Sequence, residues 1–145
     1  MPVQIDVRGP RFSAALTCAV LSLAYLGRLD LLLAAQVVVF AIAAFGGLRR
    51  SPYGNLFRLL KRRLDWGPPP ATEPEAAPRF SQLLGFVFSA AGLIAVLSGA
   101  PTVGWTLVLI VVALSALLAA TGLCVGCELY TLAQRVRGRA EVAQR

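Results

Sequence analysis

The stretch Val103–Leu123, VGWTLVLIVVALSALLAATGL, is almost entirely apolar and contains no charged side chain. A helix that crosses a bilayer needs about 20 consecutive, mostly apolar residues, which this stretch supplies. Three similar runs precede it in the chain, at about 11–26, 31–48 and 79–97. We therefore predict an all-α integral membrane protein with four transmembrane helices.

The composition supports this class and excludes several kinds of chemistry. Hydrophobic residues make up 57% of the chain and charged residues only 14%, whereas soluble domains average about 25% charged residues. Apart from Arg11 and Arg79, which open the first and third runs, no Asp, Glu, Lys or Arg lies inside the four runs, which argues against an ion-coupled transporter or a pump. The chain has no histidine, so imidazole catalysis and histidine metal ligation are excluded.

An amphipathic helix is predicted directly after the second run. Ser51 can cap it, and Pro52 suits the first helical position, where a missing N–H is harmless. Its apolar side chains recur in helical steps and form one stripe: Tyr53, Leu56, Phe57, Leu60 and Leu64. The candidate lipid-binding cations of this region are Arg49, Arg50, Arg58, Lys61, Arg62 and Arg63. We expect the helix to lie in the headgroup plane on the cytoplasmic side, with its arginines on anionic lipid rather than on nucleic acid.

The chain also shows signs of a duplicated helical hairpin. The tetrapeptide Pro-Arg-Phe-Ser at 10–13 recurs at 78–81, each time just before an apolar run. The first hairpin unit would cover 8–66 and the second 79–138. Because each unit contains two predicted spans, both would insert in the same sense, related by an axis along the membrane normal.

Two proline-containing segments are predicted to interrupt the helices of this single membrane domain, 1–145. Residues 67–78 are rich in proline and are expected to form an extended, solvated linker without helix. A break is also expected at Gly9-Pro10, ahead of the first run.

The distribution of basic residues predicts the orientation. If both ends and the linker lie on one side of the membrane, that side carries every Lys and Arg of the chain except Arg28. Cytoplasmic segments are enriched in Lys and Arg. The N-terminus, the linker and the C-terminus are therefore predicted to be cytoplasmic in a multi-pass protein of the plasma membrane.

The candidate reactive residues are Cys124 and Cys127, at the cytoplasmic edge of the fourth run. On a continuous helix, residues three apart lie on one face with Cα atoms about 5 Å apart, which a disulfide tolerates. The cytoplasm is reducing, so a transient or catalytic disulfide is favoured over a permanent one. Glu128 follows directly and would modulate the charge of the pair.

Gly122 and Gly126 both offer places to break the helix, and the reactivity of the pair depends on whether the helix continues through Gly126. In a continuous helix, the carboxyl-end dipole and Glu128 both disfavour a thiolate. If the helix breaks at Gly126, Cys127 opens a new helix whose N–H groups favour one. Two other interpretations stay open: a small-residue packing seam, or a metal site completed by Cys18, Glu128 or a symmetry mate. We predict neither a cofactor nor a bound metal.

Four segments together resemble a known family. They are Asp6–Phe12, Leu48–Gly54, Pro78–Phe80 and Gly122–Tyr130. The last is the most specific, because Cys124, Gly126, Cys127 and Glu128 match the pattern Cys-x-Gly-Cys-Glu. The family is the uncharacterised bacterial membrane family called domain of unknown function 4395, which is common in actinobacteria. Its members are often encoded near thioredoxin-like proteins and sulfurtransferases, so the resemblance implies thiol or sulfane-sulfur traffic.

The predicted function is a cytoplasm-facing thiol–disulfide or sulfur-relay protein of the bacterial cytoplasmic membrane. Its predicted partners are the lipid bilayer and a cytoplasmic thioredoxin-like or sulfurtransferase protein, with a homo-oligomer left open and no nucleic acid. The alternatives are a non-enzymatic scaffold or anchor that recruits a cytoplasmic partner, and a carrier of small sulfur compounds.

Overall fold

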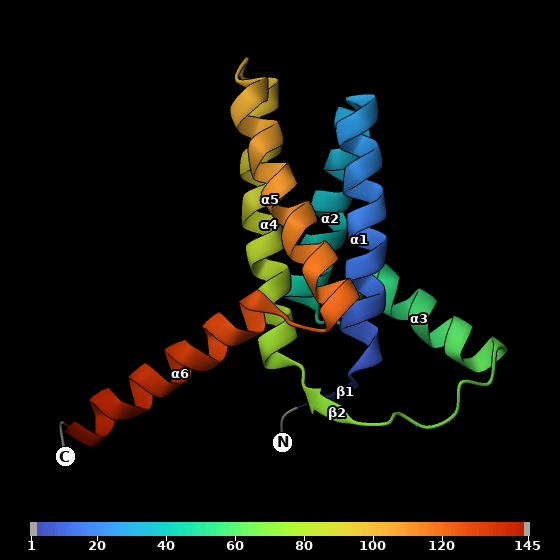
Figure 1. The fold of residues 1–145 in the computed structure, drawn as a ribbon, viewed down its shortest axis with the longest axis vertical. Coiled ribbons are helices and arrows are strands. Elements are labelled where there is room, and N and C mark those ends of the chain that lie inside the picture. Colours follow the sequence, from blue (N-terminus) through green and yellow to red (C-terminus); the bar gives the residue numbers. More distant parts are fainter. Residues whose placement is uncertain (1–2, 144–145) are drawn as a thin grey trace.

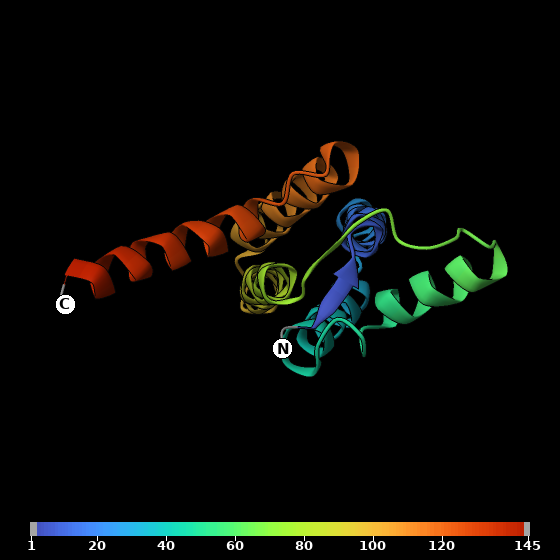
Figure 2. The same ribbon diagram turned by 90° about the horizontal axis from the view of Figure 1, so that it is seen from below.

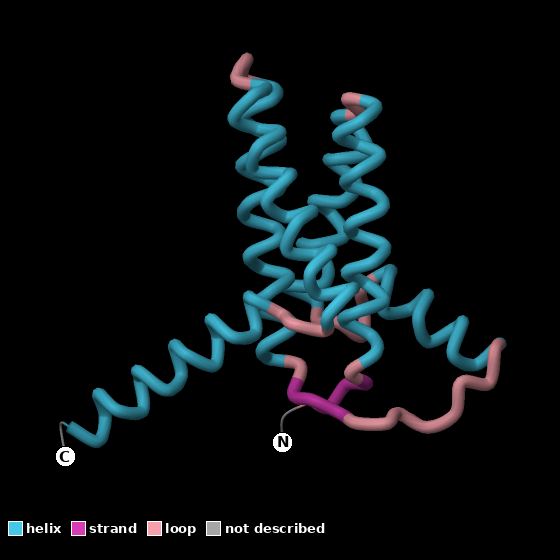
Figure 3. The backbone as a smooth tube through the Cα atoms, in the orientation of Figure 1, coloured by secondary structure: helices cyan, strands magenta, loops and turns pink. Residues whose placement is uncertain are grey.

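The computed structural model describes residues 3–143, and these are helical apart from two short strands and the connections (Figures 1 and 3). The elements in chain order are β1 (Gln4–Asp6), α1 (Arg8–Gly27), α2 (Asp30–Gly46), α3 (Pro52–Arg63), β2 (Thr72–Pro74), α4 (Ala76–Leu97), α5 (Pro101–Thr121) and α6 (Val125–Ala143).

The helices α1, α2, α4 and α5 stand side by side and form the body of the molecule (Figure 1). Three of them, α1, α4 and α5, are long and apolar enough to cross a membrane, which fits a multi-pass membrane protein. The helix α2 is apolar but shorter, at 17 residues. Each hairpin packs against the other, with α1 on α5 and α2 on α4.

The buried side chains of the bundle come from both hairpins. The centre of this core is made of Leu21, Ala24, Leu33, Phe40, Trp105, Val108 and Val111. Among the buried polar side chains, Gln36 is the largest and is only 1% exposed. Gln36 Nε2 donates to Thr17 Oγ1 at 3.4 Å, and its Oε1 accepts from the Tyr53 hydroxyl at 2.5 Å. These bonds satisfy the buried amide and tie α1, α2 and α3 together.

Two arginines cap helices of the opposite hairpin. Arg11, on α1, donates from Nη2 to the carbonyls of Ala119 and Ala120 at 3.2 and 3.4 Å, near the end of α5. Arg79, on α4, donates to two carbonyls near the end of α2, at 2.6 Å from Nε and 2.9 Å from Nη2. Helix carboxyl ends carry unpaired carbonyls and partial negative charge, so a cation stabilises them. Both arginines occupy the same place in the repeated tetrapeptide.

Both copies of that tetrapeptide lie inside helices, which corrects two predictions. The helix α1 begins at Arg8, so Gly9-Pro10 does not break it. The helix α4 begins at Ala76, so the end of the predicted linker 67–78 is helical. Pro10 and Pro78 are each the third residue of their helix. The first four N–H groups of a helix have no intrahelical partner, so a proline there removes no hydrogen bond.

The linker is extended over Thr72–Pro74, but it is tied to the start of the chain. The strands β1 and β2 pair antiparallel, with Ile5 opposite Glu73. The adjoining Asp6 carboxylate, whose side chain is only 11% exposed, pairs with Arg8 at 2.9 Å and with Lys61 of α3 at 2.8 Å. This cluster joins the N-terminal segment to α3 at the base of the bundle.

Replacing Asp6 by asparagine is expected to lower the free energy of unfolding by about 1 to 2 kcal/mol at neutral pH. Burial alone would raise the pKa of Asp6, but hydrogen bonds from Arg8 and Lys61 outweigh it and hold the pKa well below its usual range. Such a group stabilises the fold above its unfolded pKa of about 4, and the stabilisation is lost as the pH falls further.

In thermal unfolding in detergent, the difference in unfolding temperature between wild type and Asp6→Asn should therefore shrink as the pH falls below about 4. The matched control is Asp65→Asn, because Asp65 is exposed and its φ of 47° suits asparagine. A difference that stays the same from neutral to acidic pH would contradict the role given to the carboxylate.

The far end of the bundle carries a single cation within the described residues, Arg28, which follows α1. Its guanidinium lies over the rings of Tyr25 and Trp105, at 4.9 and 5.4 Å from their centroids. Cation–π contacts of this kind hold a charge against an aromatic surface. The other described Lys and Arg residues lie in α3, in the connection before it, in α6, or near the starts of α1 and α4, which are at the end of the bundle where the strands lie (Figure 1).

Candidate functional site

The chain turns sharply between α5 and α6, and the turn forms the candidate site. The helix α5 ends at Thr121, and Gly122 adopts a left-handed conformation with φ 77°, which favours glycine. The Leu123 N–H then donates to Thr121 Oγ1 at 3.2 Å. The helix α6 begins at Val125, so of the two glycines at which a break was possible, the chain breaks at Gly122, and α6 runs through Gly126. Figure 2 shows α6 and α3 leaving the bundle in opposite directions.

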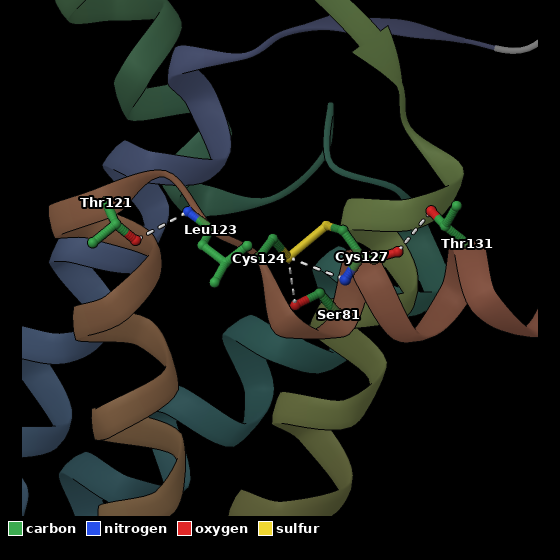
Figure 4. The surroundings of a disulfide bond; sticks show 6 residues. All are labelled: Ser81, Thr121, Leu123, Cys124, Cys127 and Thr131. Atoms are coloured by element: carbon green, nitrogen blue, oxygen red, sulfur yellow. Dashed lines mark hydrogen bonds between the residues drawn. A yellow bond between two sulfur atoms is a disulfide. The ribbon is translucent and has the colours of Figure 1, made fainter.

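This turn places Cys124 directly before the first turn of α6. Its carbonyl accepts from the Glu128 N–H at 3.0 Å, and its Sγ accepts from the Cys127 N–H at 3.3 Å (Figure 4). Cys124 therefore stands where a serine or aspartate side chain caps other helices. A helix that opens at Cys127 was one of the alternatives left open by the sequence; in the structure Cys124 lies directly before α6, and Cys127 is the third residue of that helix.

The two cysteines form a disulfide with Cα atoms 5.1 Å apart (Figure 4). Because N–H groups and the positive end of the helix dipole face Cys124, a thiolate released there by reduction is stabilised. Glu128 directly follows Cys127 in the first turn of α6, and its side chain is exposed. A carboxylate suits the first turn of a helix.

Ser81 of α4 completes the surroundings of the disulfide, and the prediction did not include it. Its Oγ lies 3.5 Å from Cys124 Sγ (Figure 4). Gly126 is buried against it, and a Cβ added there would lie 2.7 Å from Ser81 Oγ. The rings of Phe80 and Tyr130 pack nearby with centroids 5.7 Å apart. The repeated tetrapeptide, which contains Phe80 and Ser81, was the signal that pointed to this segment.

A cavity of about 200 Å³ adjoins the disulfide. Its wall includes Cys124 and residues from α1, α2, α4, α5 and α6, and it contains no charged side chain. Two phenylalanines, Phe40 and Phe88, and the hydroxyl groups of Thr17 and Ser115 belong to this wall. The disulfide therefore borders on a largely apolar cavity, which the spacing of the cysteines gave no means to foresee.

The metal interpretation finds no ligand set in the described part of the chain. No three side chains from His, Cys, Asp and Glu gather there in a way that could hold an ion. Cys18 is a free thiol, half-buried on α1.

The candidate lipid-binding residues divide into two groups. The helix α3 begins at Pro52 as predicted, although Ser51 makes no side-chain capping bond. Arg58 donates to the Arg49 carbonyl and to Asn55 Oδ1, and Lys61 pairs with Asp6. The predicted cations whose side chains stay exposed without such a bond are Arg49, Arg50, Arg62 and Arg63.

The apolar stripe of α3 is divided as well. Phe57 is only 5% exposed, and its ring packs 5.6 Å from that of Phe12 on α1. Leu56 and Leu64 remain 39% and 56% exposed. The helix therefore buries one part of its stripe on the bundle and leaves another part uncovered.

A bundle of long apolar helices with a cysteine pair at the start of a surface helix defines a helical membrane protein with a candidate thiol site. The chain belongs to the family described as "Domain of unknown function (DUF4395)", whose model matches residues 5–135. The match includes the five helices α1 to α5 and the Cys124–Cys127 pair. No curated protein and no solved structure matches the chain.

Proposed function

We propose that this protein is a thiol–disulfide protein of the bacterial cytoplasmic membrane, in which Cys124 and Cys127 cycle between a dithiol and a disulfide. The observation that carries the proposal is the helix cap. Cys124 Sγ receives the Cys127 N–H at 3.3 Å at the start of α6, so one sulfur of the pair is prepared to leave as a thiolate. Two cysteines with a packing role alone would not need a backbone N–H group directed at one of the sulfurs.

The cap assigns different roles to the two sulfurs. A soluble cytoplasmic protein with a dithiol, such as a thioredoxin-like partner, attacks Cys127 through one thiolate. The S–S bond breaks, Cys124 leaves as the stabilised thiolate, and a mixed disulfide forms between Cys127 and the partner. The second thiol of the partner then displaces Cys127. Two electrons have passed to the pair, and the partner holds the new disulfide. A thiol that is stabilised as its anion leaves faster, which favours this direction of attack.

The proposal includes the arrangement in the membrane. We take α2 as a fourth span beside α1, α4 and α5, with both hairpins inserted in the same sense as a duplicated unit. The reciprocal capping by Arg11 and Arg79 supports the duplication. The positive-inside rule then puts the base of the bundle in the cytoplasm, with the exposed arginines of α3 on lipid headgroups.

The roles of the sulfurs predict which cysteine holds a trapped partner. When the oxidised protein meets a dithiol protein that lacks its second cysteine, the thiolate of that protein should form a mixed disulfide with Cys127, and Cys124 should be released as a thiol that can be alkylated. Neither Cys124→Ser nor Cys127→Ser should accept the partner in this way, because neither variant has a disulfide to be attacked. Non-reducing gels and alkylation followed by mass spectrometry of membranes measure both. Cys18→Ser is the control and should cycle like the wild type. If Cys124 and Cys127 resist alkylation after reduction and never pair under mild oxidant, the proposed function is wrong.

The proposed orientation predicts a labelling pattern. In a chain whose three cysteines are replaced by serine, Ala71→Cys places a thiol in the exposed linker and Ser98→Cys places one at the far end. A membrane-impermeant maleimide should label Ser98→Cys in intact cells and Ala71→Cys only after the membrane is opened. Labelling of the linker from outside would reverse the assignment.

A further inference from the structure

The volume, the wall and the opening of the cavity beside the disulfide together indicate which class of ligand it can bind. Its volume of about 200 Å³ lies below the range of roughly 300 to 1,000 Å³ usual for drug-sized ligands, so it has room for one small ring system. The absence of charged side chains from its wall disfavours nucleotides and anionic thiols, because an unpaired charge in an apolar site is costly.

The wall also offers hydrogen-bond donors to such a ring. Thr17 Oγ1 already accepts from Gln36 Nε2 at 3.4 Å, so its own proton is left to donate into the cavity. Ser81 and Ser115 hydroxyls belong to the same wall. A neutral ligand that carries carbonyl oxygens on an apolar ring matches these donors and the neighbouring phenylalanine rings.

The cavity reaches the outer surface of the protein at two exposed apolar side chains. Leu114 and Leu129 both line it, and they are 41% and 49% exposed. An apolar tail attached to the ring therefore has a route out into lipid. At the other end the wall contains Cys124, whose sulfur belongs to the redox pair.

We propose that this cavity binds the ring of a membrane-soluble quinone, which takes electrons from the reduced Cys124–Cys127 pair. The inference rests on the proposed function and names the second substrate of the same site. The two thiols lose two electrons and two protons and form the S–S bond. The quinone takes up the two electrons and two protons and leaves as the quinol. Cys124 faces the quinone, while Cys127 exchanges with the soluble dithiol.

The test uses the full chain, reduced and reconstituted in lipid nanodiscs, with decylubiquinone as the probe. Quinol formation is followed by absorbance, and disulfide formation by alkylation and mass spectrometry. Ser115→Phe fills the cavity with a ring. Ala113→Phe is the matched control, because Ala113 is exposed on the same helix and does not line the cavity.

We expect quinone-dependent oxidation to be roughly a hundredfold slower in Ser115→Phe, because a quinone ring displaced from the cavity no longer lies in position to react with Cys124. Ala113→Phe should leave the rate unchanged. Oxidised glutathione, which is water-soluble, should close the disulfide equally fast in all three proteins. Equal glutathione rates show that the thiols of the variants are intact, and an unfolding temperature in detergent close to that of the wild type shows that the variants are folded; if Ser115→Phe fails this check, Leu118→Phe in the same wall replaces it.

The outcomes separate the two proposals. If neither oxidant closes the pair, the proposed function itself fails. If glutathione closes it and the quinone does not, the quinone inference alone is overturned. The same holds if the quinone oxidises wild type, Ser115→Phe and Ala113→Phe at equal rates, because the reaction then takes place outside the cavity.

Discussion

Gly126→Leu should lower the free energy of unfolding by about 3 kcal/mol, the upper end of the cost of overpacking. A Cβ at this position would lie 2.7 Å from Ser81 Oγ and 2.9 Å from Ser81 Cα. The hydroxyl can rotate away, but the Cα belongs to the backbone of α4 and cannot. The start of α6 must therefore move away from α4, and the larger leucine side chain increases the displacement.

The displacement should affect the two reactions of the pair differently. The contact between the Cys127 N–H and Cys124 Sγ lies within the first turn of α6, so it moves with the helix. Reduction of the disulfide by a small water-soluble dithiol should stay close to the wild-type rate. The contact with Ser81 and the position of Cys124 in the cavity wall depend on α4, so oxidation by a quinone should be lost.

A matched control lies in the same helix. Gly138 has no atom within 4 Å of an added Cβ, so Gly138→Leu should change the stability by less than about 0.5 kcal/mol. A second comparison is Ser81→Gly in the Gly126→Leu background, which removes part of the clash. Because residues in contact have non-additive effects, the second substitution should restore some of the lost stability. Equal unfolding midpoints for Gly126→Leu and Gly138→Leu in detergent would show that the tight contact has no energetic role.

Gly126 also shows where the sequence was sufficient and where it was not. The apolar runs, the start of α3 at Pro52 and the proximity of the two cysteines follow from local composition and spacing. The position of the helix break does not, because Gly122 and Gly126 are equally able to interrupt a helix. Gly122 supplies the left-handed turn, and Gly126 is small because α4 packs on it. Only the tertiary contact distinguishes a glycine that bends the chain from one that makes room for a neighbour.

The same limit explains the other differences. Lys61 was assigned to lipid because its neighbours along the chain are arginines, but Asp6 reaches it from 55 residues away. Pro78 was assigned to the linker because proline disfavours helix interiors, although the first turn accepts it. The cavity is assembled from five helices, so no single segment indicates it. For Lys61 and for the cavity, the deciding partners are distant in sequence and are brought close only by the tertiary fold.

Arg79→Met should destabilise the bundle by about 2 kcal/mol, because it removes two charge-assisted hydrogen bonds to the end of α2. The bonds to the carbonyls of Ala44 and Phe45 are 2.6 and 2.9 Å long. Methionine keeps much of the apolar stem of the arginine. The loss of stability therefore measures the interaction of the guanidinium group with the carbonyl end of α2. Arg79→Lys should recover only part of the stability, since a lysine lacks the fork that reaches both carbonyls.

The equivalent arginine of the first hairpin tests whether this capping is shared by the two halves. Arg11→Met should destabilise in the same direction but by less, because its bonds to the end of α5 are longer, at 3.2 and 3.4 Å. The two sites cap different helices, so the double variant should show nearly additive losses in thermal unfolding in detergent. Arg137→Met, at an exposed position of α6, is the control and should be neutral. If all three single variants unfold at the same temperature, these arginines are surface charges and the two hairpins are held together by apolar packing alone.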